Sequence, residues 1–129
     1  MRWILLACAA VLVFDGVSAL AARAFDFAYG GFPGIIVSTA IYAFPAVMAV
    51  HRGHKLRVAT IAGATVALVD ATAGWAVSWL IGPGAPPADS RSPALLVLTA
   101  TTVVVLGAVV GLAAAWITRR VARNSSARL

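Results

Sequence analysis

The stretch ALLVLTATTVVVLGAVVGLAAAWIT, residues 94–118, runs for 25 residues without a charged side chain. A helix needs about 20 consecutive apolar residues to cross the hydrocarbon core of a bilayer, because each residue advances the helix by about 1.5 Å. The stretch is long enough for this, and it contains no charged side chain that would favour contact with water. It therefore predicts a membrane-spanning helix.

The composition of the whole chain agrees with a lipid environment. Of the 129 residues, 62% are hydrophobic and 11% are charged. Soluble domains are about 45–50% apolar and about 25% charged. Because a chain this short has little interior in which to bury apolar surface, water is a poor solvent for it. We expect one integral membrane domain over residues 1–129.

Charged residues and Gly/Pro clusters divide the rest of the chain into further apolar segments. Lipid cannot satisfy open backbone groups, and four spans cannot close a β-barrel, so the spans must be helices. The predicted fold is an all-α polytopic membrane protein, a four-transmembrane-helix bundle. It could be built from two tandem helical hairpins, residues 1–51 and 56–120. The predicted spans are 3–22, 32–50, 58–81 and 94–118, followed by a basic cytoplasmic tail at 119–129.

Lysine and arginine residues are divided unequally between the two ends of these spans. Eight lie on one side and two, Arg23 and Arg91, on the other. An excess of positive charge in short loops marks the cytoplasmic side. We expect both termini in the cytoplasm and the protein in the cytoplasmic (inner) membrane. The eight are Arg2, Arg52, Lys55, Arg57, Arg119, Arg120, Arg123 and Arg128.

The first span has a second interpretation. Arg2, the apolar run from Trp3 to Phe14 and the small residues that follow are similar to a secretory signal peptide. Cleavage after Ala19 or Ala21 would leave three spans and an external amino terminus. The sequence leaves this alternative open.

Two aspartates, Asp15 and Asp70, lie inside apolar spans. Each follows an arginine of the inner boundary, Arg2 or Arg57, by 13 residues. Both therefore lie about 20 Å along their helices, near the middle of the membrane. A central aspartate costs about 2.5–3.5 kcal/mol on insertion scales, which disfavours a lipid-facing position. We expect both carboxyl groups to point into the bundle.

Several chemical states would suit such an acid. It could be protonated, touch a water-filled cavity or hold a cation. No Lys, Arg or His lies within the spans, so an ion pair inside them is excluded, although Ser, Thr and Tyr hydroxyls are available. An intramembrane acid is a candidate for proton or ion transfer by default. A purely structural hydrogen-bonding role is the alternative.

Small residues and one proline predict how the helices pack. Gly63 and Gly74 share the helix face of Asp70 together with Ala73, and Gly107 and Gly111 form a GxxxG stretch. Such residues let two helices approach closely, either within one chain or between chains. Pro45 lies inside the second span and is expected to kink that helix.

The remaining polar residues exclude several classes of function. One cysteine and two histidines make a metal site improbable, and no nucleophile–base constellation is present, so we expect no enzyme and no cofactor. The net charge of +6 lies at the ends of apolar segments, which indicates anionic lipid rather than nucleic acid as the partner. The residues expected at lipid headgroups are Arg52, Lys55, Arg57, Arg119 and Arg120.

Two functional hypotheses remain. The first is an accessory or assembly subunit whose small-residue faces pack against partner helices in a homo-oligomer or larger membrane complex. The second is a small proton- or cation-coupled transporter or channel that uses Asp15 and Asp70. The sequence names neither a substrate nor a partner.

Overall fold

The computed structural model describes residues 2–25, 32–82 and 92–126. Within them the chain forms a bundle of four helices that are long and apolar enough to span a membrane. These are α1 (Arg2–Phe25), α2 (Phe32–His51), the continuous span Leu56–Ile81 and α5 (Pro93–Ser126). The third span consists of α3 (Leu56–Val69), a π-helical turn η1 (Asp70–Gly74) and α4 (Trp75–Ile81). The protein is thus a four-helix membrane bundle.

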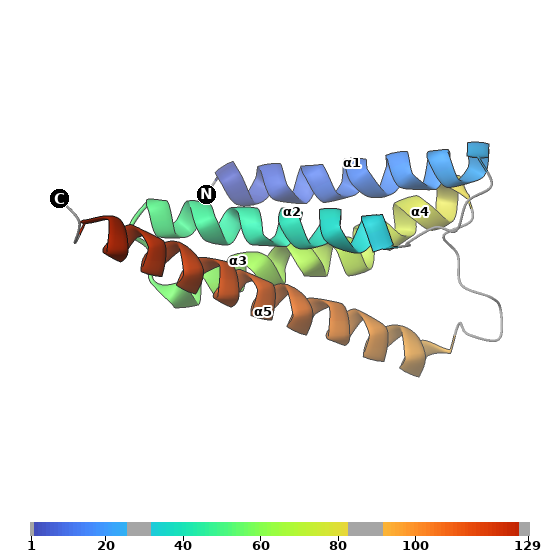
Figure 1. Cartoon of the computed structure of the whole chain (residues 1–129). Coiled ribbons are helices and arrows are strands. Elements are labelled where there is room, and N and C mark those ends of the chain that lie inside the picture. Colours follow the sequence, from blue (N-terminus) through green and yellow to red (C-terminus); the bar gives the residue numbers. More distant parts are fainter. Residues whose placement is uncertain (1, 26–31, 83–91, 127–129) are drawn as a thin grey trace.

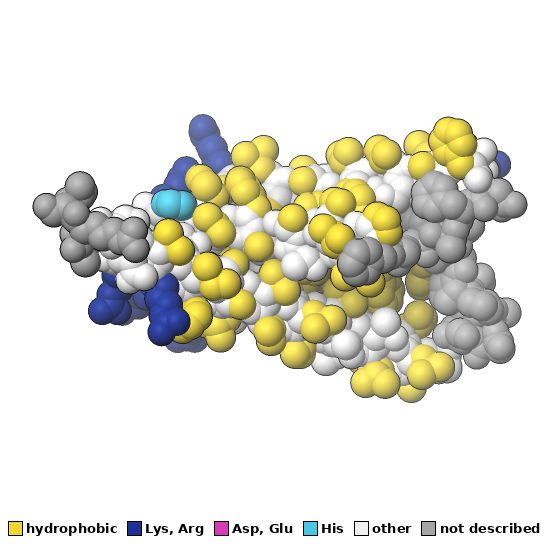
Figure 2. Space-filling view, viewed as in Figure 1, with side chains coloured by type: hydrophobic (Ala, Val, Ile, Leu, Met, Phe, Trp, Pro, Cys, Tyr) yellow, Lys and Arg dark blue, Asp and Glu magenta, His cyan; other side chains and the backbone are white. Residues whose placement is uncertain are grey.

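Successive spans run in opposite directions (Figure 1). The start of α1, the α2–α3 connection and the end of α5 therefore lie at one end of the bundle. This end carries the single lysine, Lys55, and most of the described arginines (Figure 2). Arg23 lies in the last turn of α1, toward the opposite end. Large apolar side chains are exposed along the helices between the two ends, as lipid contact requires (Figure 2).

The turn between α2 and α3 fixes these two helices as antiparallel neighbours. Gly53 has a positive φ of 75°, a conformation that glycine adopts without steric cost. The amide of His54 donates to the carbonyl of Ala49 at 3.0 Å, and that of Gly53 donates to the carbonyl of Val50 at 2.9 Å. This is the Schellman arrangement that ends many helices.

The last helix is longer than the predicted span. It does not end at Thr118 but continues to Ser126, so most of the basic tail predicted at 119–129 is helical. Hydropathy marks where the bilayer ends, which is not where the helix ends. The residues after Thr118 include Arg and Ala, which favour helices, and no Gly or Pro. Arg123 in the last turn also complements the helix dipole.

The third span contains a feature that the sequence analysis did not anticipate. Residues Asp70–Gly74 form a π-helical turn inside the apolar helix. The turn changes which residues face inward: Asp70, Ala71 and Gly74 are buried, whereas Ala73, which an α-helical register places beside Asp70, is exposed. Turns of this kind within α-helices are frequent at functional sites.

Glycines allow α3 and α5 to cross at close range. A Cβ on Gly107 would lie 2.8 Å from the carbonyl oxygen of Gly63, and one on Gly111 would lie 2.9 Å from that of Ala59. A Cβ on Gly63 would in turn collide with the carbonyl of Gly107. The predicted GxxxG stretch thus packs inside the chain.

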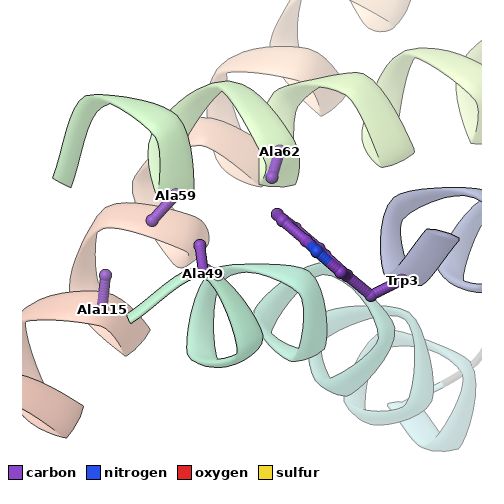
Figure 3. Packing of buried hydrophobic residues seen from close by; sticks show 6 residues of the cluster. Trp3, Ala49, Ala59, Ala62 and Ala115 are labelled. Carbon is purple, nitrogen blue, oxygen red and sulfur yellow. The ribbon is translucent and has the colours of Figure 1, made fainter. Parts of the chain in front are cut away.

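At the basic end of the bundle one tryptophan packs among alanines of the other helices (Figure 3). Trp3 of α1 is only 4% exposed and extends from α1 toward the alanines of the other helices. The buried side chains that pack together here form the Trp3 cluster, which consists of Trp3, Ala46, Ala49, Ala59, Ala62 and Ala115.

Candidate functional site

Two buried carboxyl groups meet in the interior of the bundle. Asp15 of α1 is 7% exposed, and Asp70, the first residue of η1, is 8% exposed. Both are next to Gly74. Asp70 Oδ1 lies 3.0 Å from the point that a Cβ on Gly74 would occupy, Asp15 Cγ lies 3.2 Å from it, and Asp15 Oδ2 is closer still. The two acids are therefore neighbours, which the sequence indicated only as equal depth.

Gly74 makes this meeting possible. Any side chain at residue 74 would take the space that the Asp15 and Asp70 carboxyl groups share. Asp70 and Gly74 both face inward within the π-helical turn, four residues apart. The glycine predicted as a helix-packing residue thus lies at the acid pair, not at the α3–α5 crossing.

A third polar group joins the pair. The buried hydroxyl of Tyr42, on α2, donates a hydrogen bond to Asp70 Oδ2. This bond fixes the orientation of the Asp70 carboxyl group. Three spans therefore contribute to one site: α1 with Asp15, α2 with Tyr42 and the third span with Asp70.

The acid pair lies on the wall of a cavity of about 460 Å³. Hydroxyl groups of Ser18, Ser38 and Thr39 also line this cavity, together with apolar side chains of α1, α2 and α5. The lining reaches Gly34 in the first turns of α2, so the cavity extends from the acid pair toward the end of the bundle opposite the Trp3 cluster.

The electrostatics of the site favour a bound positive charge. No Lys, Arg or His occurs in the apolar stretches 3–22, 32–50, 58–81 and 94–118, so none of these basic side chains can neutralise the pair from within the spans. Two negative carboxylates close together in a medium of low dielectric constant repel each other strongly. A proton shared by the pair, or a cation beside it, removes this repulsion.

The other residues singled out from the sequence lie away from the acid pair. Pro45 is fully buried inside α2, which continues as a helix through it. Arg52, Lys55 and Arg57 are exposed at the α2–α3 connection.

The two arginines at the end of the last span have specific contacts. Arg119 donates from Nη2 to the carbonyl of His54 at 2.6 Å, and the guanidinium of Arg120 lies 4.4 Å from the ring centroid of Trp116. Arg119 thereby joins α5 to the α2–α3 connection. Arg91 and Arg128 lie outside the described residues.

Three features of the site were not identified from the sequence. The π-helical turn has no counterpart in the hydropathy pattern, and Tyr42 was only one of many candidate hydroxyls. Trp75 lines the cavity and stacks on Trp79 with 6.2 Å between ring centroids, but tryptophans near span ends ordinarily indicate the membrane interface.

Comparison with known proteins adds no family to this description: no protein-family model, curated protein or solved structure matches the chain.

Proposed function

We propose that the protein is a small carrier that couples the movement of a cation to that of protons, with Asp15 and Asp70 as the ion-binding groups. The observation that supports this most directly is the convergence of the two carboxyl groups on Gly74, at the wall of a cavity lined by residues of all four spans. A proton and a cation compete for the same negative charge, and this competition is the basis of exchange. The hydrogen bond from Tyr42 holds Asp70 in place for both.

The shape of the bundle suggests how exchange proceeds. The cavity extends from the acid pair toward the start of α2, whereas Trp3 and its alanines pack between the helices at the basic end. We infer that in this state the acid pair exchanges ions through the part of the cavity near Gly34 and not past the Trp3 cluster. Transport then requires a second state in which the helices separate at the Trp3 cluster and close around Gly34.

The alternative function, an accessory subunit, has less support. It was inferred from small-residue faces that a partner helix would cover. Gly63, Gly107 and Gly111 contact one another across α3 and α5, and Gly74 faces the two acids. These glycines make their close contacts within the chain, so a partner helix would have to bind to another surface. A protein that co-purifies in fixed stoichiometry from mild detergent would favour this alternative.

Single substitutions of the acids test the proposed function. We expect Asp15→Asn and Asp70→Asn each to lower proton-coupled cation flux by at least about tenfold, because each removes one of two charges that bind the ion. The assay uses vesicles that contain the purified protein and a pH-sensitive dye. Inward gradients of Na⁺, K⁺ and choline are imposed one at a time, and lumenal alkalinisation is recorded.

The matched control is Thr101→Val, because Thr101 is exposed on α5 and its hydroxyl donates to the carbonyl of Val97 in the same helix. This variant should keep the flux of the unmodified protein. Flux that equals that of protein-free vesicles for all three cations, or that is unchanged in both aspartate variants, would overturn the proposed function.

We further propose that the basic end faces the cytoplasm and meets anionic headgroups, with the protein in the cytoplasmic membrane. Arg52, Lys55, Arg57, Arg119 and Arg120 are all in this part of the bundle. A fluorescent reporter that matures only in the cytoplasm should be active when fused to the carboxyl terminus, whereas alkaline phosphatase at the same position should be inactive. The reverse pattern would show that the orientation is wrong.

A further inference from the structure

The cavity beside the acid pair is larger and more apolar than a bare ion requires. Its volume of about 460 Å³ lies within the range of about 300–1,000 Å³ that is usual for small-molecule sites. A proton needs none of this volume. An inorganic cation would be better held by a compact shell of oxygen ligands than by a cavity with apolar walls.

Aromatic side chains line the same cavity as the acids. They are Phe14 of α1, Tyr42 of α2 and Trp75 of α4. The Trp75 ring stacks on that of Trp79. The faces of aromatic rings attract cations, most strongly where water is excluded, and they also pack against apolar groups. Carboxyl groups and aromatic rings together are the chemistry that recognises an organic ammonium ion.

We propose that this cavity binds a monovalent organic cation with an apolar body, such as a quaternary ammonium. This inference depends on the proposed function, because it names the cation that exchanges with protons at Asp15 and Asp70. The positive nitrogen lies by the acid pair and the aromatic rings, and the apolar body contacts the α5 wall at Val103 and Leu106. Charge balances if the protonated pair releases one proton as one cation binds. The cation comes either from water or from the choline headgroup of a lipid.

Binding can be measured without transport. The purified protein in phosphatidylglycerol nanodiscs, weakly buffered, is titrated with benzyltrimethylammonium, while heat and proton release are recorded. We expect saturable binding with release of about one proton per site. The neutral isostere neopentylbenzene should release none. Trp75→Leu should weaken binding by at least about tenfold, and Asp15→Asn with Asp70→Asn should abolish it.

The controls separate this inference from the proposed function and identify the source of the cation. Thr101→Val should bind like the unmodified protein, and weaker binding in phosphatidylcholine nanodiscs would identify the lipid headgroup as a competing source of the same chemistry. Absent binding, equal binding of the isostere or an unaffected Trp75→Leu variant would overturn the inference. If Na⁺ or K⁺ flux still depends on the aspartates in that case, the proposed function stands. If benzyltrimethylammonium binds but no cation moves, the binding site stands and the carrier function fails.

Discussion

Gly74→Ala should reduce coupled flux to the level of protein-free vesicles while the protein remains folded. The added methyl group would occupy the space that Asp15 Oδ2 fills and would approach Asp70 Oδ1 to 3.0 Å. Both groups are ends of flexible side chains, so they can move aside at little cost to the fold. The carboxyl groups would then no longer lie side by side, so the site would lose the paired charges that bind the ion. Flux and the free energy of unfolding are measured on the same preparation.

Gly16→Ala is the matched control for this variant. Gly16 is adjacent to Asp15, at nearly the same depth, but a Cβ there would meet only Val77 Cγ1 at 3.6 Å and Ile81 Cδ1 at 3.8 Å. These are ordinary contacts, so flux should stay at the level of the unmodified protein. An active Gly74→Ala protein, or an equal loss in both variants, would contradict the convergence of the two acids on residue 74.

At the α3–α5 crossing, by contrast, a glycine substitution should destabilise the fold. Gly63→Ala should lower the free energy of unfolding by about 1–3 kcal/mol, the usual cost of adding a methylene to a well-packed core. The Cβ would collide with the backbone of Gly107 and lie 3.1 Å from Gly111 Cα. A backbone atom can move only if the helix moves, so α3 and α5 must separate. Denaturant titration in detergent gives the difference.

Gly34→Ala is the control for the crossing, because no atom lies within 4 Å of the Cβ that it would add. It should leave the free energy of unfolding unchanged or raise it slightly, since alanine favours helices more than glycine does. If Gly63→Ala is no less stable than Gly34→Ala, the two helices do not cross at these glycines. Comparison of flux and unfolding free energy with those of Gly74→Ala then distinguishes a glycine that lets two helices pack from a glycine that makes room for the acid pair.

The number and positions of the helices could be predicted from the sequence because hydrocarbon imposes a simple length requirement. The stretch 94–118 lies entirely within α5. The extent of α5 beyond Thr118 could not be predicted in this way, because a helix formed by Arg and Ala can continue into water. Hydropathy reports the solvent around a residue and not the conformation of the backbone.

The acids illustrate the same limit at the site. Their cost in lipid and their small neighbours indicated that Asp15 and Asp70 point inward, and both are buried. Their meeting at Gly74 depends on how α1 rotates against the third span, which no local pattern specifies. Tyr42 could not be selected from the other hydroxyls for the same reason, since its role follows from packing between α2 and η1.

Disulfide formation between α1 and η1 reports whether Asp15 and Gly74 lie side by side in the membrane. In a Cys8→Ala background, Asp15→Cys and Gly74→Cys place two thiols where Asp15 Cγ is now 3.2 Å from the Cβ point of residue 74. The sulfur introduced at residue 15 would take the place of Asp15 Cγ, and in a disulfide with an S–S bond of about 2.05 Å the sulfur of one cysteine lies about 3 Å from the Cβ of the other, so a bond is feasible. Val13→Cys with Gly74→Cys is the control, because Val13 is 65% exposed on the outer face of α1.

Membranes that contain each pair are oxidised and denatured, and the remaining thiols are labelled with a maleimide of high mass. We predict that both thiols of the 15/74 pair are protected after oxidation, whereas those of the 13/74 pair react. Free thiols in the 15/74 pair, equal protection in both pairs, or a chain from which the first span has been cleaved would contradict the proposal that Asp15 and Asp70 form one site in the membrane.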